Sequence, residues 1–211
     1  MAPLTLDDLL PLEEYMVKRR EFFDSHCRYL DRYRRVRIGP RLTLVFENRQ
    51  TLWFRVQEIA RVARLADAET LQQELNLFNS LLPGLNQLQA ALLIEIDDPS
   101  KIAAELSAWR NIDGADLRLR LGERSYPATL ITCRPEDRCA GTSHWVQFHL
   151  DDAARAILAS AQQQAFVEFG NASRNFYRHQ SAPMSDDIRQ SLLDDLKLSD
   201  RDAHKARARS A

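Results

Sequence analysis

The fold is decided by residues 41–96, which contain RLTLVFENRQTLWFRVQEIARVARL (41–65) and ETLQQELNLFNSLLPGLNQLQAALLIEI (69–96). Apolar residues alternate with Thr43 and Val45 along 42–46, which is typical of a half-buried strand. A helix is expected from about Gln50, and a second helix follows a candidate N-cap at Asp67 and stops at Pro83. Residues 88–96 are apolar enough for a central strand that is buried on both faces. The stretch therefore predicts strand, helix, helix, strand.

The same patterns predict the elements outside this stretch. They are a long N-terminal helix over 11–34, a short helix over 98–109, a hairpin of strands 116–121 and 126–132, a strand over 144–150, a helix over 151–161, a last strand over 165–169 and a terminal helix over 185–196. Residues 199–211 hold too few apolar side chains to fold, so a disordered tail is predicted. Hairpins mixed with helical crossovers predict one α+β domain over residues 1–198, with a mainly antiparallel (mixed) sheet flanked by helices.

The composition narrows the class of protein. The chain has 211 residues, is 45% hydrophobic and carries a formal net charge of −1, so no global field attracts nucleic acid or an anionic membrane. No apolar run approaches the roughly 20 residues of a membrane span, and acids stand where a signal peptide has a basic start. The three cysteines, Cys27, Cys133 and Cys139, are an odd number without metal-type spacing. We therefore expect a cytoplasmic protein with free thiols.

The common catalytic signatures are absent. The chain has no G-x-G-x-x-G, Walker A, G-x-S-x-G or H-E-x-x-H motif, so no nucleotide site, hydrolase nucleophile or zinc protease site is indicated. The sequence assigns no catalytic residue and predicts no cofactor, which favours a protein that is not an enzyme.

A basic segment at the end of the first predicted helix is the first candidate binding surface. The candidate partner-binding residues are Arg28, Arg32, Arg35 and Arg37. The segment also contains Arg34 and Arg41, with Tyr29 and Tyr33 between the arginines. Arginine and aromatic side chains together are suited to a nucleic-acid backbone, but nearby acids and the overall charge disfavour that partner. An acidic protein partner is the second interpretation. A solvated helix end with favourable basic charge is the simplest interpretation of the segment.

Carboxylates and histidines form the second candidate. The carboxylates are Glu47, Glu58, Glu74 and Glu95, and the histidines are His144 and His149. A set of this kind can hold iron, manganese or zinc. His144 and His149 are five residues apart on one predicted strand, so they point to opposite faces and cannot share one metal without a bulge. The alternative is a Glu58 paired with an arginine. We retain Glu58 and His144 as metal candidates but predict no metal site.

The corner between the first strand and helix of the central stretch is the third candidate. Glu47, Asn48 and Arg49 follow the strand directly, and Glu58 lies further along the helix. Polar side chains at such a corner cap the helix and fix the turn, or they line a ligand cleft at the strand end. Asn79, before Pro83, has the same two interpretations, with helix termination favoured.

Three segments carry a resemblance to a known family. FENRQTLWFRVQEIARVARL (46–65), ELNLFNSLLPG (74–84) and LQAALLIEI (88–96) resemble the bacterial family catalogued as domain of unknown function 3501, over roughly residues 10–197. The family has no assigned catalytic residues. Its genes often stand beside those of rubrerythrin and of a cysteine-rich iron–sulfur oxidoreductase, so the resemblance implies redox or peroxide-stress work and those two partners. Residues 171–180 read NASRNFYRHQ, where the resemblance implies a His-Pro-Asn-Tyr-like segment.

Three functional hypotheses follow. The first is a non-catalytic accessory or adaptor protein of an iron–sulfur oxidoreductase and rubrerythrin system. The second is a metal- or small-ligand-binding enzyme of oxidative-stress metabolism, which requires Glu47, Arg49, Glu58 and His144 to converge in one pocket. The third is a nucleic-acid-binding regulator, which requires the basic residues and exposed aromatic rings to share one face.

Overall fold

The computed structural model describes residues 1–109, 112–131, 143–171 and 174–209. Cys133 and Cys139 lie outside these residues, so their predicted state as free thiols stays a prediction, while Cys27 is a free cysteine. Among the described residues no helix is long and apolar enough to span a membrane.

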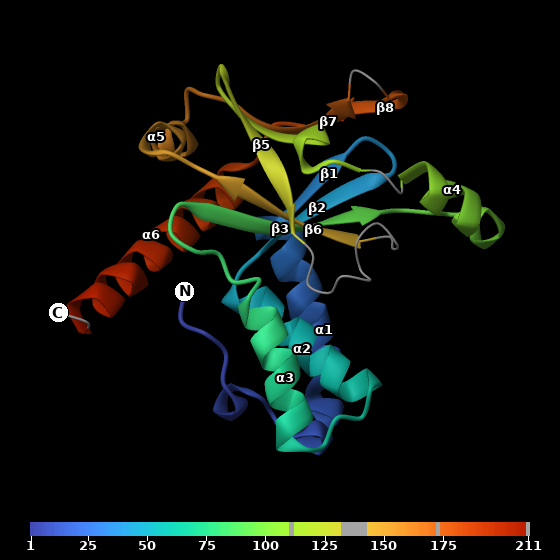
Figure 1. Cartoon of the computed structure of the whole chain (residues 1–211), viewed down its shortest axis with the longest axis vertical. Coiled ribbons are helices and arrows are strands. Elements are labelled where there is room, and N and C mark those ends of the chain that lie inside the picture. The colour runs from blue at the N-terminus through green and yellow to red at the C-terminus, as the bar shows by residue number, and fades with distance from the viewer. Residues whose placement is uncertain (110–111, 132–142, 172–173, 210–211) are drawn as a thin grey trace.

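One antiparallel sheet organises the described chain, in the strand order β1-β2-β3-β6-β5-β4-β7-β8 (Figure 1). The strands are β1 (Arg35–Ile38), β2 (Leu42–Glu47), β3 (Gln87–Ile94), β4 (Leu117–Leu121), β5 (Arg124–Ile131), β6 (Ser143–His149), β7 (Ala165–Asn171) and β8 (Arg174–Gln180). The helices are α1 (Leu12–Tyr33), α2 (Arg49–Val62), α3 (Ala68–Asn79), α4 (Ile102–Trp109), α5 (Asp152–Ala159) and α6 (Asp186–Arg209), with 3-10 turns at Leu6–Asp8, Pro99–Lys101 and Gly114–Asp116. The predicted α+β fold with a long N-terminal helix is confirmed.

The sheet curls until its two edges nearly meet. The end of β1 forms a bridge between Ile38 and Ser181, just beyond β8, so the sheet is close to a barrel. Its inner face holds the main core, to which strand residues such as Leu44, Leu92 and Phe148 contribute. Leu192 and Leu196 of α6 pack into the same core. Burial of this single continuous core is the main force that holds the curled sheet together.

Helices α1, α2 and α3 form a layer below the sheet (Figure 1). A second, smaller core lies within this layer and includes Leu52, Leu75 and Phe78. Trp145 of β6 packs against it, whereas its neighbour Val146 faces the main core, as the alternation of a strand requires. Because β3 lies between the two layers, its residues are buried on both faces, as predicted.

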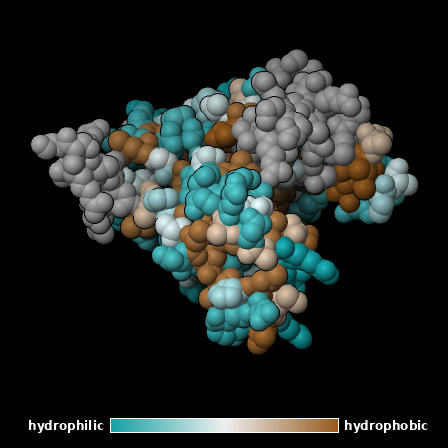
Figure 2. Space-filling view, turned by 60° about the horizontal axis from the view of Figure 1, so that its bottom comes forward, coloured by the Kyte–Doolittle hydropathy of each residue, from teal (hydrophilic) through white to brown (hydrophobic). Residues whose placement is uncertain are grey.

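The far end of the helical layer exposes apolar side chains. Met16, Val17 and Val62 are 60%, 86% and 70% exposed. Apolar and polar residues alternate over the helical part of the surface in Figure 2, so this surface is mixed rather than one continuous apolar patch.

The sequence did not predict strands β1 and β8, and each omission has a physical reason. Residues 35–38 were interpreted as part of a basic helix end, but Val36 and Ile38 face the core as β1. The prediction that 165–169 is the last strand is wrong, because β8 follows it and pairs with β7. The sequence of β8, RNFYRHQ, has only two apolar residues, and it is an edge strand whose backbone pairing does not require an apolar face.

Helix α6 continues through most of the segment that was predicted to be a disordered tail. It runs to Arg209, well beyond the predicted domain boundary at residue 198. The segment is poor in large apolar residues but rich in alanine and arginine, which have high helix propensity.

The N-terminal segment is held by the last residue of α3. The side-chain amide of Asn79 accepts a hydrogen bond from Leu4 N (2.7 Å) and donates one to Leu4 O (2.8 Å). Leu4 is buried in the second core. Asn79 therefore holds the N-terminal segment against α3, which is a structural role.

Tyr177 of β8 closes the seam between the two sheet edges. Its hydroxyl donates to Ile38 O (2.7 Å) and accepts from Arg41 N (3.1 Å). The turn between these residues contains Gly39 at φ +65°, where an added Cβ would lie 2.8 Å from the Tyr177 hydroxyl. Only glycine fits this turn without strain, since both the backbone angle and the close approach exclude a side chain.

We predict that Tyr177→Phe lowers the free energy of unfolding by about 1–3 kcal/mol, because the buried carbonyl of Ile38 and the partly buried amide of Arg41 each lose a partner. The matched control is Tyr126→Phe, which removes the exposed hydroxyl contact to Asp151 (2.7 Å) and is expected to cost less than about 0.5 kcal/mol. Urea denaturation of both variants provides the comparison. An equal loss of unfolding free energy in the two variants would contradict the role of Tyr177 in closing the two sheet edges.

Candidate functional site at the corner between the sheet and α2

The corner after β2 is built around the cap of helix α2. Asn48 Oδ1 accepts hydrogen bonds from Gln50 N (3.0 Å) and Thr51 N (3.1 Å). In return, Asn48 N donates to Thr51 Oγ1 (2.9 Å). This reciprocal arrangement satisfies the free amides of the first turn, so the sequence Glu-Asn-Arg-Gln-Thr ends the strand and starts the helix at once.

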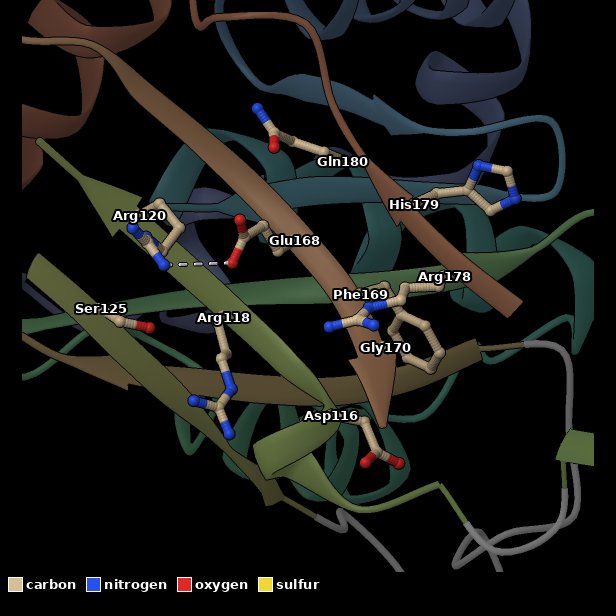
Figure 3. A pocket seen from close by; sticks show the side chains of 10 residues that line it. All are labelled: Asp116, Arg118, Arg120, Ser125, Glu168, Phe169, Gly170, Arg178, His179 and Gln180. Carbon is tan, nitrogen blue, oxygen red and sulfur yellow. Dashed lines mark ion pairs between the residues drawn. The ribbon is translucent and has the colours of Figure 1, made fainter. Parts of the chain in front are cut away.

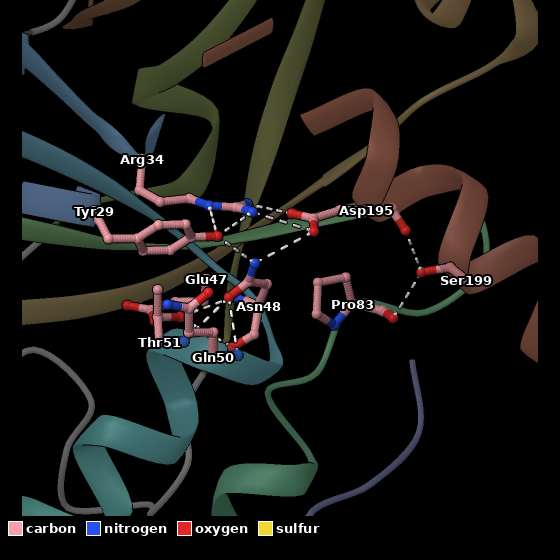
Figure 4. Close-up of polar contacts among 9 residues, drawn as sticks. All are labelled: Tyr29, Arg34, Glu47, Asn48, Gln50, Thr51, Pro83, Asp195 and Ser199. Atoms are coloured by element: carbon pink, nitrogen blue, oxygen red, sulfur yellow. Dashed lines mark hydrogen bonds and ion pairs between the residues drawn. The ribbon is translucent and has the colours of Figure 1, made fainter. Parts of the chain in front are cut away.

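The other side of the Asn48 amide enters a buried polar network (Figure 4). Asn48 Nδ2 donates to the Tyr29 hydroxyl (2.9 Å) and to Asp195 Oδ1 (3.4 Å). Arg34 donates to the Tyr29 hydroxyl through Nε (2.9 Å) and Nη2 (2.7 Å). It also forms an ion pair with Asp195, in which the side chains are only 3% and 4% exposed. The network thus joins α1, the start of β1, the cap of α2, and α6.

Burial and charge act in opposite directions on this pair. Burial raises the pKa of Asp195, while the charge of Arg34 and the hydrogen bonds from Arg34 and Asn48 act to lower it. A second contact fixes α6 nearby, where Ser199 Oγ donates to Pro83 O (3.3 Å). The pair is stable in the interior only because each charge has its partner and its hydrogen bonds.

Glu47 lies on the helical side of the sheet and is joined to the cap of α2 through the Thr51 hydroxyl. Its side chain is 0% exposed and accepts hydrogen bonds from Arg55 Nε (3.0 Å) and Nη2 (2.6 Å) and from the Thr51 hydroxyl. The Arg55 guanidinium also lies over the Trp145 ring, 5.0 Å from its centroid. Both carboxylate oxygens are therefore engaged, and Glu47 ties α2 to the sheet.

Glu58 is held at the opposite end of α2. It accepts hydrogen bonds from the Tyr15 hydroxyl (2.8 Å), from Arg19 (2.9 Å) and from Arg61 (3.0 Å). Burial raises the pKa of Glu58, but the hydrogen bonds from Arg19, Arg61 and Tyr15 outweigh burial and lower it to about 2. This is the alternative of an arginine-paired Glu58, and the group links α1 to α2.

Asn48 and Arg49 are the two candidate ligand-binding residues that share a pocket. The pocket has a volume of about 470 Å³, and its lining also includes Trp53 and Asp195. Arg49 forms an ion pair with Asp8 (2.7 Å) and donates to Ala2 O (3.2 Å), so its charge already holds the N-terminal segment. Neither Glu47 nor Glu58 lines this pocket.

His144 lies on the other face of the sheet from Glu47. Glu47 pairs with Gln89 and His144 with Leu92, and positions three apart on β3 face opposite sides. His144 is 4% exposed, burial lowers its pKa, and its Nε2 has no hydrogen-bond partner among the described residues. Within those residues, no group of three or more His, Cys, Asp or Glu side chains is placed to hold a metal ion. The groups required by the enzyme hypothesis therefore do not converge.

The four arginines of the basic segment lie along α1 and β1. Arg28, Arg32 and Arg37 are exposed, and Arg35 is half-buried. Arg32 pairs with Asp187 (2.8 Å) and Arg35 pairs with Asp31. Among the described residues, no carboxylate forms an ion pair with Arg28 or Arg37.

The sequence analysis missed the most buried ion pair of the corner. Arg34 and Asp195 are 161 residues apart, and each lies in a run of charged residues that reads as a solvated surface. The position of Asp195 within its helix was the signal that could have revealed the pair. Asp195 stands between Leu192, Leu193 and Leu196 in the apolar stripe of its helix, where a charged residue needs a partner.

Comparisons with known proteins support the family and the fold of this chain, and the matched proteins are described as having unknown function. The sequence profile of a family described as "Protein of unknown function (DUF3501)" matches residues 3–196. A crystal structure of a novel protein of unknown function from Burkholderia pseudomallei is similar to this chain, with 27% sequence identity and a TM-score of 0.81. The similarity covers 92% of this chain and 100% of that one. No curated protein matches the chain.

The contacts of Glu58 predict a specific pH dependence. Its folded pKa of about 2 lies below the ordinary value of 4.5, so its contribution to stability is present above pH 4.5 and is lost as the pH falls toward 2. We expect Glu58→Gln to lower the free energy of unfolding by about 2–3 kcal/mol at pH 6, and this difference to shrink toward zero at pH 2.

Urea denaturation of both proteins between pH 6 and pH 2 measures this difference. Glu69→Gln, at an exposed position in the first turn of α3, controls for the loss of one carboxylate. A difference between wild type and Glu58→Gln that stays constant from pH 6 to pH 2 would contradict the assigned role.

Proposed function

The chain belongs to the DUF3501 family, whose members are described as proteins of unknown function, and we propose that it is a non-catalytic accessory protein of an iron–sulfur oxidoreductase and rubrerythrin redox system. In this proposal it docks on an acidic surface of one of these partners. The docking surface consists of Arg28, Arg32, Arg35 and Arg37. The observation that carries the proposal is the exposure of Arg28 and Arg37 without carboxylate partners among the described residues.

The state of the candidate catalytic groups supports a binding role. Glu47 and Glu58 each accept hydrogen bonds from arginine and hydroxyl groups of their own chain. A carboxylate used as a base or metal ligand needs at least one oxygen open to its substrate or metal. Glu47 instead connects α2 to the sheet, and Glu58 connects α2 to α1. Both carboxylates therefore have structural contacts.

The geometry of the arginines supports the choice of an acidic partner. Arg28 and Arg32 are one helical turn apart on α1, and Arg35 and Arg37 are two residues apart on β1, so each pair shares a face. Asp31 and Asp187 neutralise Arg35 and Arg32, but exposed ion pairs of this kind contribute little and exchange readily with a partner's carboxylates. A surface with surplus positive charge accelerates and orients association with an acidic protein.

Contacts within the segment disfavour nucleic acid. The Tyr29 ring is half-buried, and its hydroxyl is hydrogen-bonded to Arg34 and Asn48. The Arg32 guanidinium lies over the Tyr33 ring, 5.1 Å from its centroid. The aromatic faces that would stack on bases are therefore already engaged inside the protein.

We predict that Arg28→Glu/Arg37→Glu weakens binding to the purified iron–sulfur oxidoreductase or rubrerythrin by at least about tenfold at low salt, because both unpaired charges are reversed. The control is Arg20→Glu/Lys197→Glu, which makes the same change in net charge at exposed positions of α1 and α6. Isothermal titration calorimetry at about 50 mM salt, where surface charges are weakly screened, provides the dissociation constants.

Failure of the wild-type protein to bind either partner would overturn the proposal. If both double variants weakened binding equally, net charge alone would explain the effect. That result would contradict the proposed docking surface.

A further inference from the structure

A hollow on the outside of the sheet gathers arginines from two strands that are far apart in the sequence. It has a volume of about 530 Å³ and lies over β4, β5, β7 and β8 (Figure 3). Its lining consists of Asp116, Arg118, Arg120, Ser125, Glu168, Phe169, Gly170, Arg178, His179 and Gln180. The volume is within the range of sites for small molecules.

Strand alternation places the charges on one side. Leu117, Leu119 and Leu121 of β4 are buried in the main core, so Arg118 and Arg120 project from the opposite face. Arg118 stands opposite Glu168 of β7, and Arg120 stands opposite Ser125 of β5. The hollow is therefore fixed by the register of the sheet.

Gly170 makes room for the third arginine. A Cβ at position 170 would lie 2.8 Å from Arg178 Cγ, closer than real contacts allow. The aliphatic stem of Arg178 occupies this space, and in Figure 3 its guanidinium extends toward the β4 side of the hollow. A side chain at position 170 would displace Arg178.

The arginines retain donors that the protein does not use. Arg120 Nη1 pairs with Glu168 at 3.6 Å, and Arg118 Nε donates to Ala115 O (3.2 Å). The Arg120 Nε is buried and has no hydrogen-bond partner among the described residues, which is costly for a charged group. Asp116 is 4% exposed and accepts from Asp113 N (3.1 Å), so it is committed to its own turn.

We propose that this hollow binds the phosphate group of a small anionic molecule. Three guanidinium groups face two carboxylates, and guanidinium donors match the geometry of phosphate oxygens. Asp116 and Glu168 also line the hollow, so its excess positive charge is small and local, which suits one phosphate group better than a polymer of phosphodiesters. Arg118 and Arg178 bind the phosphate, and the Ser125 hydroxyl is available as a further donor. This inference is independent of the docking surface on α1 and β1.

Calorimetric titration with pyrophosphate at low salt tests the site. We expect wild-type protein to bind and Arg118→Gln/Arg178→Gln to bind at least about tenfold more weakly, because two charge-assisted contacts are removed. The matched control is Arg20→Gln/Arg124→Gln, which removes two exposed arginines outside the hollow and should bind as wild type does.

A second variant separates loss of the site from loss of the fold. Glu168→Gln removes the negative charge that partly neutralises Arg120 and repels an anion in the hollow, so pyrophosphate should bind about three- to tenfold more tightly. A damaged fold cannot produce this gain. Weaker or unchanged binding by Glu168→Gln would count against the assigned hollow.

Two further probes define the ligand class. Citrate carries carboxylates without phosphorus, and a short single-stranded RNA carries phosphodiesters in a chain. Preference for pyrophosphate over both supports the inference. Absence of pyrophosphate binding to wild type, or a preference for citrate or RNA, would overturn it.

Discussion

The burial of Arg34 and Asp195 against each other is the constraint on which the arrangement of the other elements depends. With side chains only 3% and 4% exposed, neither charge can remain in the interior without the other. Arg34 directly precedes β1 and Asp195 lies in α6, so the pair holds α6 against the start of β1. Tyr29 and Asn48 then satisfy the remaining donors and acceptors, so α1 and the cap of α2 take fixed positions around the pair.

This constraint changes the meaning of the polar corner. Glu47, Asn48 and Arg49 form a conspicuous polar sequence at a strand end, the position where ligand sites are often found. In the folded protein their groups cap a helix, tie it to the sheet and hold the N-terminal segment. Among the described residues, the arginines of the two proposed binding surfaces lie instead on outer surfaces, along α1 and β1 and in the hollow over β4 and β7. The polar corner is therefore a structural contact between α2, the sheet and the N-terminal segment.

The sequence predicts this fold where local patterns are strong and fails where edge strands are polar or contacts are long-range. The strand over 42–46, the cap at Asp67 and the double-sided burial of 88–96 are local signals, and the structure has each of them. The prediction that 42–46 is only half-buried is wrong, because the helical layer covers the face that carries Thr43 and Val45. Strands β1 and β8 were missed although each pairs with its neighbour in the sequence, β2 or β7, because they are sheet edges with polar sequences. The closure of the sheet, which brings Ile38 beside Ser181, is a long-range contact. The hollow with Arg118 and Arg178 has the same origin, because only the sheet register brings those strands together. The cap at Asn48 was predictable from its type and position, whereas its contact with Asp195 was not.

A double-mutant cycle on Arg34 and Asp195 tests the central constraint most directly. The free energy of unfolding is measured for wild type, Arg34→Met, Asp195→Leu and the double variant. If the pair fixes the junction, each single variant loses about 3–5 kcal/mol because one buried charge is left alone. The double variant should then lose less than the sum, by at least about 2 kcal/mol. Single losses that add to within about 0.5 kcal/mol would show that the two charges do not depend on each other, and would contradict the account.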